Sequence, residues 1–370
     1  MKIALYIVLT IVFVGISFFV WAYVKVSRIE KEKTELEYFV EQNSIDSALQ
    51  VFLSQFPVNT QIAVAHIQND KVVFYGYIHK ETGVEVVNNQ HAVFEIGSVS
   101  KTFTAALAAI CFERGLLKPS TTLKEVLQTP MPNDVQAITL EQLSNHSSGL
   151  ARLPSNLTMD NPSNPYEDYD TTQLFSYLKK AKLDNKPGTV YSYSNTGAGL
   201  LGTICANVLH LSYEQALQQY IFTLYKMNTS SVKLTPQQQA VLVKGQDAEG
   251  NEISNWNFDC LAGAGGIKST ISDMALYAQE NLNEQNTIFS SCHKPTFKVN
   301  EQMSIGLGWH LITTKTGATV LFHNGGTGGY TSSVMLDKQA QKGIIILSNI
   351  SAFHPKMSLV DALCAQILKK

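Results

Sequence analysis

Ser98-Val99-Ser100-Lys101 opens a stretch that predicts a helix over 98–117, closed near Gly115. Residues three positions apart share one face of a helix, about 5–6 Å apart at Cβ, so Ser98 and Lys101 would be neighbours. Ser98 would lie in the first turn, where unpaired N–H groups and the helix dipole favour developing negative charge. A serine hydroxyl needs a base to act as a nucleophile, and a lysine that burial deprotonates can supply one. An isolated S-x-x-K is more often a helix cap followed by a surface lysine, so other motifs must decide.

A second candidate motif lies further along the chain, in Tyr191-Ser192-Tyr193-Ser194-Asn195. A tyrosinate beside a lysine ammonium can take the serine proton and later return it to the leaving group. Asn195 offers an amide that can hold a substrate carbonyl or Lys101. Taken alone, Tyr193 is better interpreted as a surface tyrosine in a loop.

The third candidate motif is the glycine-rich run His323-Asn324-Gly325-Gly326-Thr327-Gly328-Gly329-Tyr330, which separates two predicted strands. Glycines allow a substrate backbone to lie close along a strand edge. A backbone N–H just past Gly325 could pair with the N–H of Ser98 as an oxyanion hole. A simple hairpin turn needs far fewer glycines, so Gly325 and Gly326 are candidate substrate-binding residues.

In this order, Ser98-x-x-Lys101, Tyr193-x-Asn195 and His323-x-Gly325 resemble the class C β-lactamase and DD-peptidase family of penicillin-recognising serine hydrolases. The resemblance extends over roughly residues 40–365. Other stretches that resemble the family are H-S-S-G-L at 146–150, Pro187-Gly188, A-G-G-I-K-S-T at 264–270 and G-L-G-W at 306–309. The resemblance implies that Ser98 forms an acyl-enzyme, that Lys101 and Tyr193 share the acid and base work, and that Asn195 positions the substrate.

His323 would stand where β-lactamases of this family usually carry the lysine of Lys-Thr-Gly. Histidine is mostly neutral at neutral pH, so it binds a substrate carboxylate less firmly than lysine does. The resemblance also implies that many esterases, aminopeptidases and DD-peptidases carry histidine there. β-Lactams, peptidoglycan-derived D-Ala peptides and simple esters are therefore all candidate substrates, and a non-catalytic scaffold with this fold is the alternative from another class.

The predicted fold class is α/β of the α+β type. The resemblance implies a five-stranded antiparallel sheet flanked by helices, beside an all-helical lobe, with the site between them. The residue pattern favours the same order, because a hairpin opens the domain, mostly helical sequence follows over about 120–290, and strands return after 300. The predicted hairpin is 61–67 with 72–78, the later strands are 306–313, 319–323, 330–336 and 343–348, and the last helix is 356–368.

The N-terminal segment differs from the rest of the chain, since residues 3–24 contain no charge. About 20 apolar residues suffice to cross a bilayer, so we expect a transmembrane signal anchor over 1–24, with a cleaved signal peptide as the alternative. A linker would follow over 25–40 and the hydrolase domain over 41–368. The family implies a domain facing the periplasm or the cell exterior, whereas the basic residues after the span favour the cytoplasm, so the orientation stays open.

Composition excludes several other classes. The formal charge is −2, from 28 basic and 30 acidic residues, which gives no indication of nucleic-acid binding. The five cysteines are scattered and odd in number, which favours buried free thiols over a disulfide framework. No histidine pair has the spacing of metal ligands, so we predict no metal and no cofactor.

Two literal motif matches are rejected. Lys315-Thr316-Gly317 lies between two predicted strands and lacks the glycine-rich continuation that follows His323, so it is interpreted as a hairpin turn. The run 197–202 fits G-x-G-x-x-G but has no preceding strand and no later acidic ribose partner, which favours small-residue helix packing over a nucleotide site.

Overall fold

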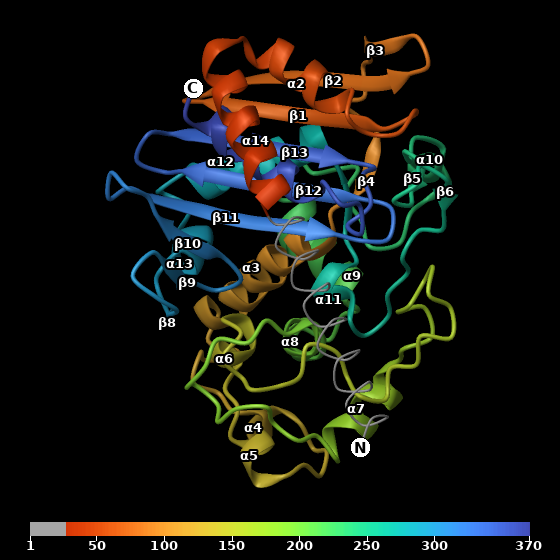
Figure 1. Ribbon diagram of the computed structural model, residues 1–370. Coiled ribbons are helices and arrows are strands. Elements are labelled where there is room, and N and C mark those ends of the chain that lie inside the picture. Colours follow the sequence, from red (N-terminus) through yellow and green to blue (C-terminus); the bar gives the residue numbers. More distant parts are fainter. Residues whose placement is uncertain (1–26) are drawn as a thin grey trace, which may run out of the picture.

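The computed structural model describes residues 27–370, and an antiparallel sheet of nine strands organises this part of the chain (Figure 1). The strand order is β3-β2-β1-β13-β12-β11-β10-β9-β8. The two ends of the domain meet in the middle of the sheet, where β1 (Gln61–Gln68) pairs with β13 (Lys342–Ser348). The N-terminal strands therefore complete a sheet whose other strands come from the C-terminal part of the chain.

The predicted five-stranded sheet is the centre of a wider one. Five strands of seven to ten residues form that centre: β1, β2 (Lys71–Lys80), β11 (Thr319–Gly326), β12 (Thr331–Asp337) and β13. Four strands of two to four residues extend the edges: β3 (Gly83–Val86), β8 (Phe297–Lys298), β9 (Met303–Ile305) and β10 (His310–Thr313). The strand expected from 306 begins only at His310, because Gly308 has a φ of +69° and a turn separates β9 from β10.

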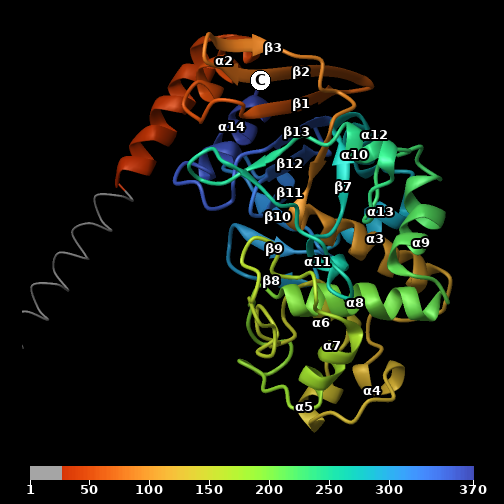
Figure 2. The ribbon, with the colours of Figure 1, turned by 90° about the vertical axis from the view of Figure 1, so that its right-hand side faces the viewer.

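Helices cover both faces of the sheet, and alternation along β1 shows how (Figures 1 and 2). Ile62 and Val64 pack with α2 (Ile45–Leu53) and α14 (Ser358–Leu368) in one buried cluster. Ala63 and Ala65 point the other way, into the larger cluster that contains α3 (Ser100–Glu113) and α12 (Ile271–Leu282). Successive side chains of a strand alternate between faces, so a single strand contributes to both cores.

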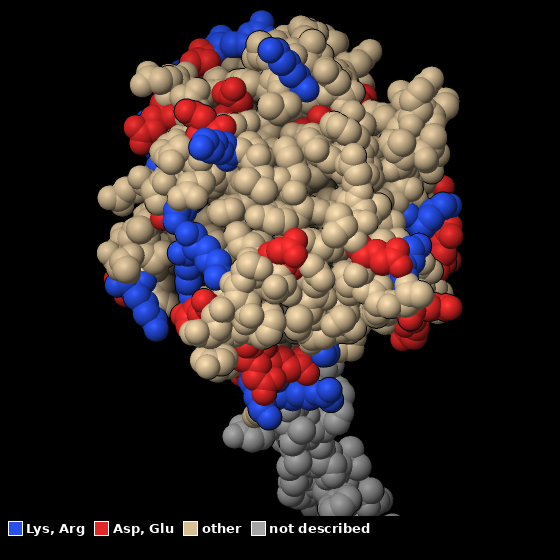
Figure 3. Space-filling model, turned by 90° about the horizontal axis from the view of Figure 1, so that it is seen from above, with Lys and Arg blue, Asp and Glu red and all other residues tan. Residues whose placement is uncertain are grey.

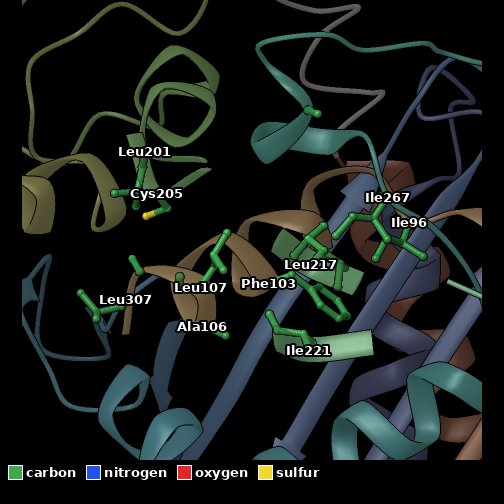
Figure 4. Close-up of a cluster of buried hydrophobic side chains, with 14 of the residues drawn as sticks. Ile96, Phe103, Ala106, Leu107, Leu201, Cys205, Leu217, Ile221, Ile267 and Leu307 are labelled. Atoms are coloured by element: carbon green, nitrogen blue, oxygen red, sulfur yellow. The ribbon is translucent and has the colours of Figure 1, made fainter. Parts of the chain in front are cut away.

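α3 joins the sheet to the helical region. Its flanks bury Phe103 and Leu107 in the same cluster as Leu201, Cys205 and Ile221 (Figure 4). The short helices α4 to α7, together with α8, lie on the side of α3 away from the sheet, whereas α12 packs against the sheet (Figures 1 and 2). The bounds are α4 Leu123–Val126, α5 Asn133–Gln136, α6 Leu140–Ser144, α7 Thr171–Leu178, α8 Asn195–Val208, α9 Tyr213–Leu217, α10 Pro236–Ala240, α11 Ala262–Gly265 and α13 Thr287–Cys292.

Two predictions about small residues are confirmed. All five cysteines are buried and free. The glycines of the G-x-G-x-x-G match serve helix packing, because a Cβ on Gly199 would lie 2.9 Å from the Leu261 Cα and one on Gly202 would lie 3.2 Å from the Gly263 Cα. α8 can therefore approach α11 this closely only without side chains at these positions.

The transmembrane part of the fold prediction is corrected. Among the helices of residues 27–370, none has the length and apolar character that crossing a bilayer requires. α3 and α8 have 14 residues each, whereas a span needs about 20, and the helix over 27–42, which includes most of the predicted linker, is rich in Glu and Lys. The predicted anchor at 1–24 lies outside the described residues.

Charges of both signs are interspersed on the face seen from above (Figure 3). Uncharged residues cover most of this face. This mixture agrees with a formal charge of −2 for the whole chain.

Candidate active site

Ser98 lies in a 3-10 turn, η1 (Gly97–Val99), immediately before α3. This turn packs against the end of β11. Gly97 has a φ of +47°, and a Cβ there would lie 2.6 Å from the Gly326 backbone nitrogen. Only glycine tolerates both the left-handed backbone and the close approach. Glycine at position 97 therefore allows the turn that carries Ser98 to pack directly against Gly326 of the third motif.

Lys101 lies in the first turn of α3 and is buried. Its Nζ is 3.0 Å from the Ser98 Oγ and 2.6 Å from the carbonyl oxygen of Ala264 in α11. The spacing of the first motif therefore brings its two functional groups into hydrogen-bond contact, as the helical periodicity predicts.

Tyr193 completes this cluster from the loop before α8. The Lys101 Nζ lies 4.7 Å from the centre of the Tyr193 ring, and the Ser98 side chain is near enough to the Tyr193 phenol to lower its pKa. The loop is held by Ser194, whose side chain accepts the N–H of Gly197 at 2.9 Å and caps α8. His146 also packs against this loop, with the centre of its ring 4.4 Å from the centre of the Tyr193 ring.

Burial sets the charge states of this trio. Burial, and next the positive charge of Arg152, lower the pKa of Lys101 well below its usual range. Burial raises the pKa of Tyr193, and the nearby Ser98 side chain opposes that shift only in part. A site with few solvating waters disfavours both charged forms, so the free site favours a neutral amine beside a neutral phenol. This agrees with the lysine deprotonated by burial that the first motif suggests, and it differs from the tyrosinate and ammonium pair considered for the second motif.

Gly325 and Gly326 lie in β11 directly against the Ser98 turn. A Cβ on Gly325 would overlap the carbonyl oxygen of Ile96 and come within 2.8 Å of the Ser98 backbone nitrogen. A Cβ on Gly326 would lie 2.6 Å from the Cβ of Ala352. The structure thus brings the backbone of the third motif beside the Ser98 N–H, as an oxyanion hole of two backbone donors requires.

We predict that Gly325→Ala lowers kcat/KM by about 100-fold or more. The added methyl group would push the turn that carries Ser98 away from β11. The backbone N–H groups of the oxyanion hole would then be misplaced, and a loss of this size is expected from that. Hydrolysis of a chromogenic ester measures the effect. Gly317→Ala is the matched control in the rejected Lys-Thr-Gly turn, since Gly317 has a φ of +86° and nothing within 4 Å of an added Cβ. The control should lose about 1 kcal/mol of stability and keep its activity. Equal activity losses in both variants would contradict the assignment of the third motif.

His323 is buried and makes a 2.7 Å hydrogen bond through Nδ1 with the carbonyl oxygen of Asn324. Its Nε2 has no protein partner among the described residues. Burial, and next the neighbouring His310, lower the pKa of His323 well below its usual value. The ring is therefore neutral at neutral pH, in line with the weaker carboxylate binding expected for histidine at this position.

Asn195 begins α8 and lies at the same site, but its amide nitrogen bonds the hydroxyl of Tyr166 at 3.2 Å rather than Lys101. Its buried Oδ1 has no described partner. Tyr166 is itself fixed by stacking on Phe258, with ring centres 4.4 Å apart. A fixed amide with a free oxygen acceptor is suited to receive an N–H of a substrate.

Several residues of the site were not predicted. His146 and His310 flank Tyr191 and Tyr193, and the Tyr191 hydroxyl is 2.9 Å from the His310 Nε2. Arg152 lies with its guanidinium carbon 5.1 Å from the centre of the Tyr193 ring. The H-S-S-G-L run carried a signal for His146, whereas nothing in the sequence indicates His310 or Arg152.

The chain is similar to known proteins over most of its length. The family model described as Beta-lactamase matches residues 58–368. A Beta-lactamase from Pseudomonas fluorescens is 26% identical over 363 residues, which cover 86% of this chain and 98% of that protein. A Beta-lactamase from Escherichia coli (strain K12) is 26% identical over 338 residues, covering 81% of this chain and 86% of that protein.

Solved structures share the fold. A structure described as a class C beta-lactamase superimposes with a TM-score of 0.76 at 24% identity, covering 90% of this chain and 97% of that one. A Beta-Lactamase/D-Alanine Carboxypeptidase from Pseudomonas syringae gives a TM-score of 0.74 at 23% identity, covering 91% of this chain and 99% of that one.

Proposed function

Because the chain belongs to the beta-lactamase family, with a class C-like fold, we propose that it is a serine hydrolase that cleaves amide or ester bonds through an acyl-enzyme on Ser98. The observation that carries this proposal is the contact of a buried, deprotonation-prone Lys101 with the Ser98 hydroxyl at 3.0 Å. Such a contact supplies the base that a serine nucleophile needs.

Acylation would use the neutral amine directly. One N–H of Lys101 donates to the Ala264 carbonyl at 2.6 Å, which leaves its lone pair free to face the Ser98 hydroxyl. As the Ser98 Oγ attacks the substrate carbonyl carbon, its proton passes to Lys101. The oxyanion would form against the N–H groups of Ser98 and Gly326, where backbone donors stabilise the developing charge.

Tyr193 would carry the proton onward. Its phenol is neutral because burial raises its pKa, and it lies near Ser98 and beside the Lys101 ammonium that acylation creates. The phenol can donate its proton to the leaving group as the tetrahedral intermediate collapses, and the new tyrosinate then takes one from Lys101. In deacylation the same pair would remove a proton from water, which attacks the ester of Ser98.

His323 favours a second candidate within the same chemistry, an esterase. The neutral, buried ring provides no fixed positive charge for a substrate carboxylate at the third motif. D-Ala peptides and β-lactams carry such a carboxylate, whereas simple esters do not need a cation there. The alternative of a non-catalytic scaffold requires that Ser98 stay unacylated in spite of its contacts.

The proposal is tested with residues 27–370, the part of the chain that carries the whole family match. Chromogenic esters, a chromogenic cephalosporin and a D-Ala-D-Ala peptide are incubated separately with the protein, and initial rates are measured. Turnover of at least one of these above the uncatalysed rate supports a hydrolase. Absence of turnover and of any covalent adduct with all three would contradict it.

We predict that kcat/KM on a neutral ester rises with pH, and that the midpoint of this rise lies below about 10.4, the usual pKa of lysine. Lys101 must be neutral to act as the base, and its lowered pKa moves the gain of activity to lower pH. Because the pKa of Tyr193 is raised, the phenol stays protonated through the usual tyrosine range and causes no decline there. Initial rates between about pH 5 and pH 10 measure the profile. A rate that rises only near pH 10 would contradict a deprotonated Lys101.

A further inference from the structure

Arg152 is an exposed cation that lies over the ring of Tyr193. Its guanidinium lies over the Tyr193 ring at 5.1 Å, while Lys101 contacts the same ring at 4.7 Å. Its backbone is fixed to the second motif, because the Arg152 carbonyl oxygen accepts the N–H groups of Asn195 at 2.9 Å and Thr196 at 3.3 Å. The position of this side chain is therefore tied to that of Tyr193 and Asn195.

The guanidinium has no acidic partner in the described part of the chain. The ion pairs found within residues 27–370 do not include Arg152, nor does its side chain take part in a hydrogen bond there. An arginine head group is planar, permanently charged and matched in geometry to a carboxylate. An exposed arginine over the ring of Tyr193, with its donors free, is suited to receive an anion.

The other basic groups of the site do not compete for that anion. Burial lowers the pKa of Lys101, His146, His310 and His323, which disfavours the charged form of each. The third motif lacks the lysine that the family resemblance leads one to expect. Positive charge is therefore found on the Tyr193 side of Ser98 and not on the β11 side.

We infer that Arg152 forms an anion-binding subsite on the Tyr193 side of Ser98, which selects substrates that carry a carboxylate near the scissile bond. This inference rests on the proposed function and adds to it a substrate preference and the residue that sets it. The carboxylate can belong to the acyl part or to the leaving group of the substrate. Esters that carry the carboxylate on only one of these parts distinguish the two cases.

The test compares matched ester pairs. Adipic acid mono-p-nitrophenyl ester against p-nitrophenyl hexanoate varies the acyl part, and 3-acetoxybenzoate against phenyl acetate varies the leaving group. In one of the two pairs, Arg152→Gln should lower the ratio of kcat/KM for the anionic ester to kcat/KM for the neutral ester by about 10- to 100-fold, mainly through KM for the anionic ester. Loss of the positive charge near Lys101 lowers the rates on both esters alike and leaves this ratio unchanged. Arg152→Lys should restore part of the loss, and salt should weaken the preference because the charge is exposed.

Equal losses on the neutral and anionic esters would overturn the subsite, since Arg152 would then act only through Tyr193. An unchanged rate on every ester would overturn it as well. Failure of the hydrolase proposal itself is distinguishable, because the unsubstituted protein would then turn over neither the neutral nor the anionic ester. Lys118→Gln, at an exposed lysine beyond the end of α3, controls for the change in net charge.

Discussion

Ser98→Ala is expected to lower kcat/KM on any ester substrate by roughly 10⁴-fold or more, the scale of removing the nucleophile of a serine hydrolase. The variant has no hydroxyl to attack the carbonyl, while Lys101, Tyr193 and the backbone N–H groups of residue 98 and Gly326 stay in place. Ser98 is only half-buried, so the free energy of unfolding should change by less than about 1 kcal/mol. Steady-state rates and thermal denaturation measure the two effects.

The exposed residue Ser155 provides the matched control, because Ser155→Ala makes the same chemical change away from the reacting groups. Its rate should equal that of the unsubstituted protein. A Ser98→Ala variant that retained more than about one tenth of the activity would contradict the role of Ser98 as the nucleophile.

Lys101→Met is expected to lower kcat by about 10²- to 10⁴-fold, the range for losing a general base. Methionine fills a similar volume but cannot accept the Ser98 proton. The loss should lie in kcat more than in KM, since the buried Lys101 acts in the reaction rather than in substrate binding. Lys118→Met is the control, as an exposed lysine that follows α3.

The same substitution should leave stability unchanged or increased at neutral pH. The pKa of Lys101 is lower in the folded protein than in the unfolded chain. At a pH between these two pKa values, the unfolded state therefore binds more protons than the folded state. Folding at neutral pH therefore costs a deprotonation that methionine does not require, which offsets loss of the contact with Ala264. Thermal denaturation tests this, and a large destabilisation with activity preserved would contradict both the buried neutral amine and its catalytic role.

Local spacing made the centre of the site predictable. Ser98 and Lys101 are three residues apart, and helical geometry alone places their side chains together at the start of α3. The turn before α3 was not predicted, because the 3-10 geometry of η1 depends on Gly97 approaching Gly326, a contact between distant parts of the chain. The central strands were likewise visible as long apolar runs, whereas β8 and β9 have only two and three residues, too few to show an alternating pattern.

Long-range packing determined what the sequence left open. His310 on β10 reaches Tyr191 only through the folding of the sheet beside the loop before α8. The neutral states of Lys101 and Tyr193 follow from burial, and burial is a property of the whole fold rather than of a motif. For the same reason Arg152, which follows the H-S-S-G-L run without a motif of its own, was found only from its position over the Tyr193 ring.

The central claim is that an acyl group is transferred to Ser98, and mass spectrometry of acid-quenched reactions tests it most directly. After incubation with a p-nitrophenyl ester or a fluorescent penicillin, one acyl group per chain should be found on the tryptic peptide 81–101, with fragment ions placing it on Ser98 and not on Ser100. The Ser98→Ala protein should carry none. Turnover without an adduct on that peptide, or an adduct on another residue that persists in Ser98→Ala, would contradict the account.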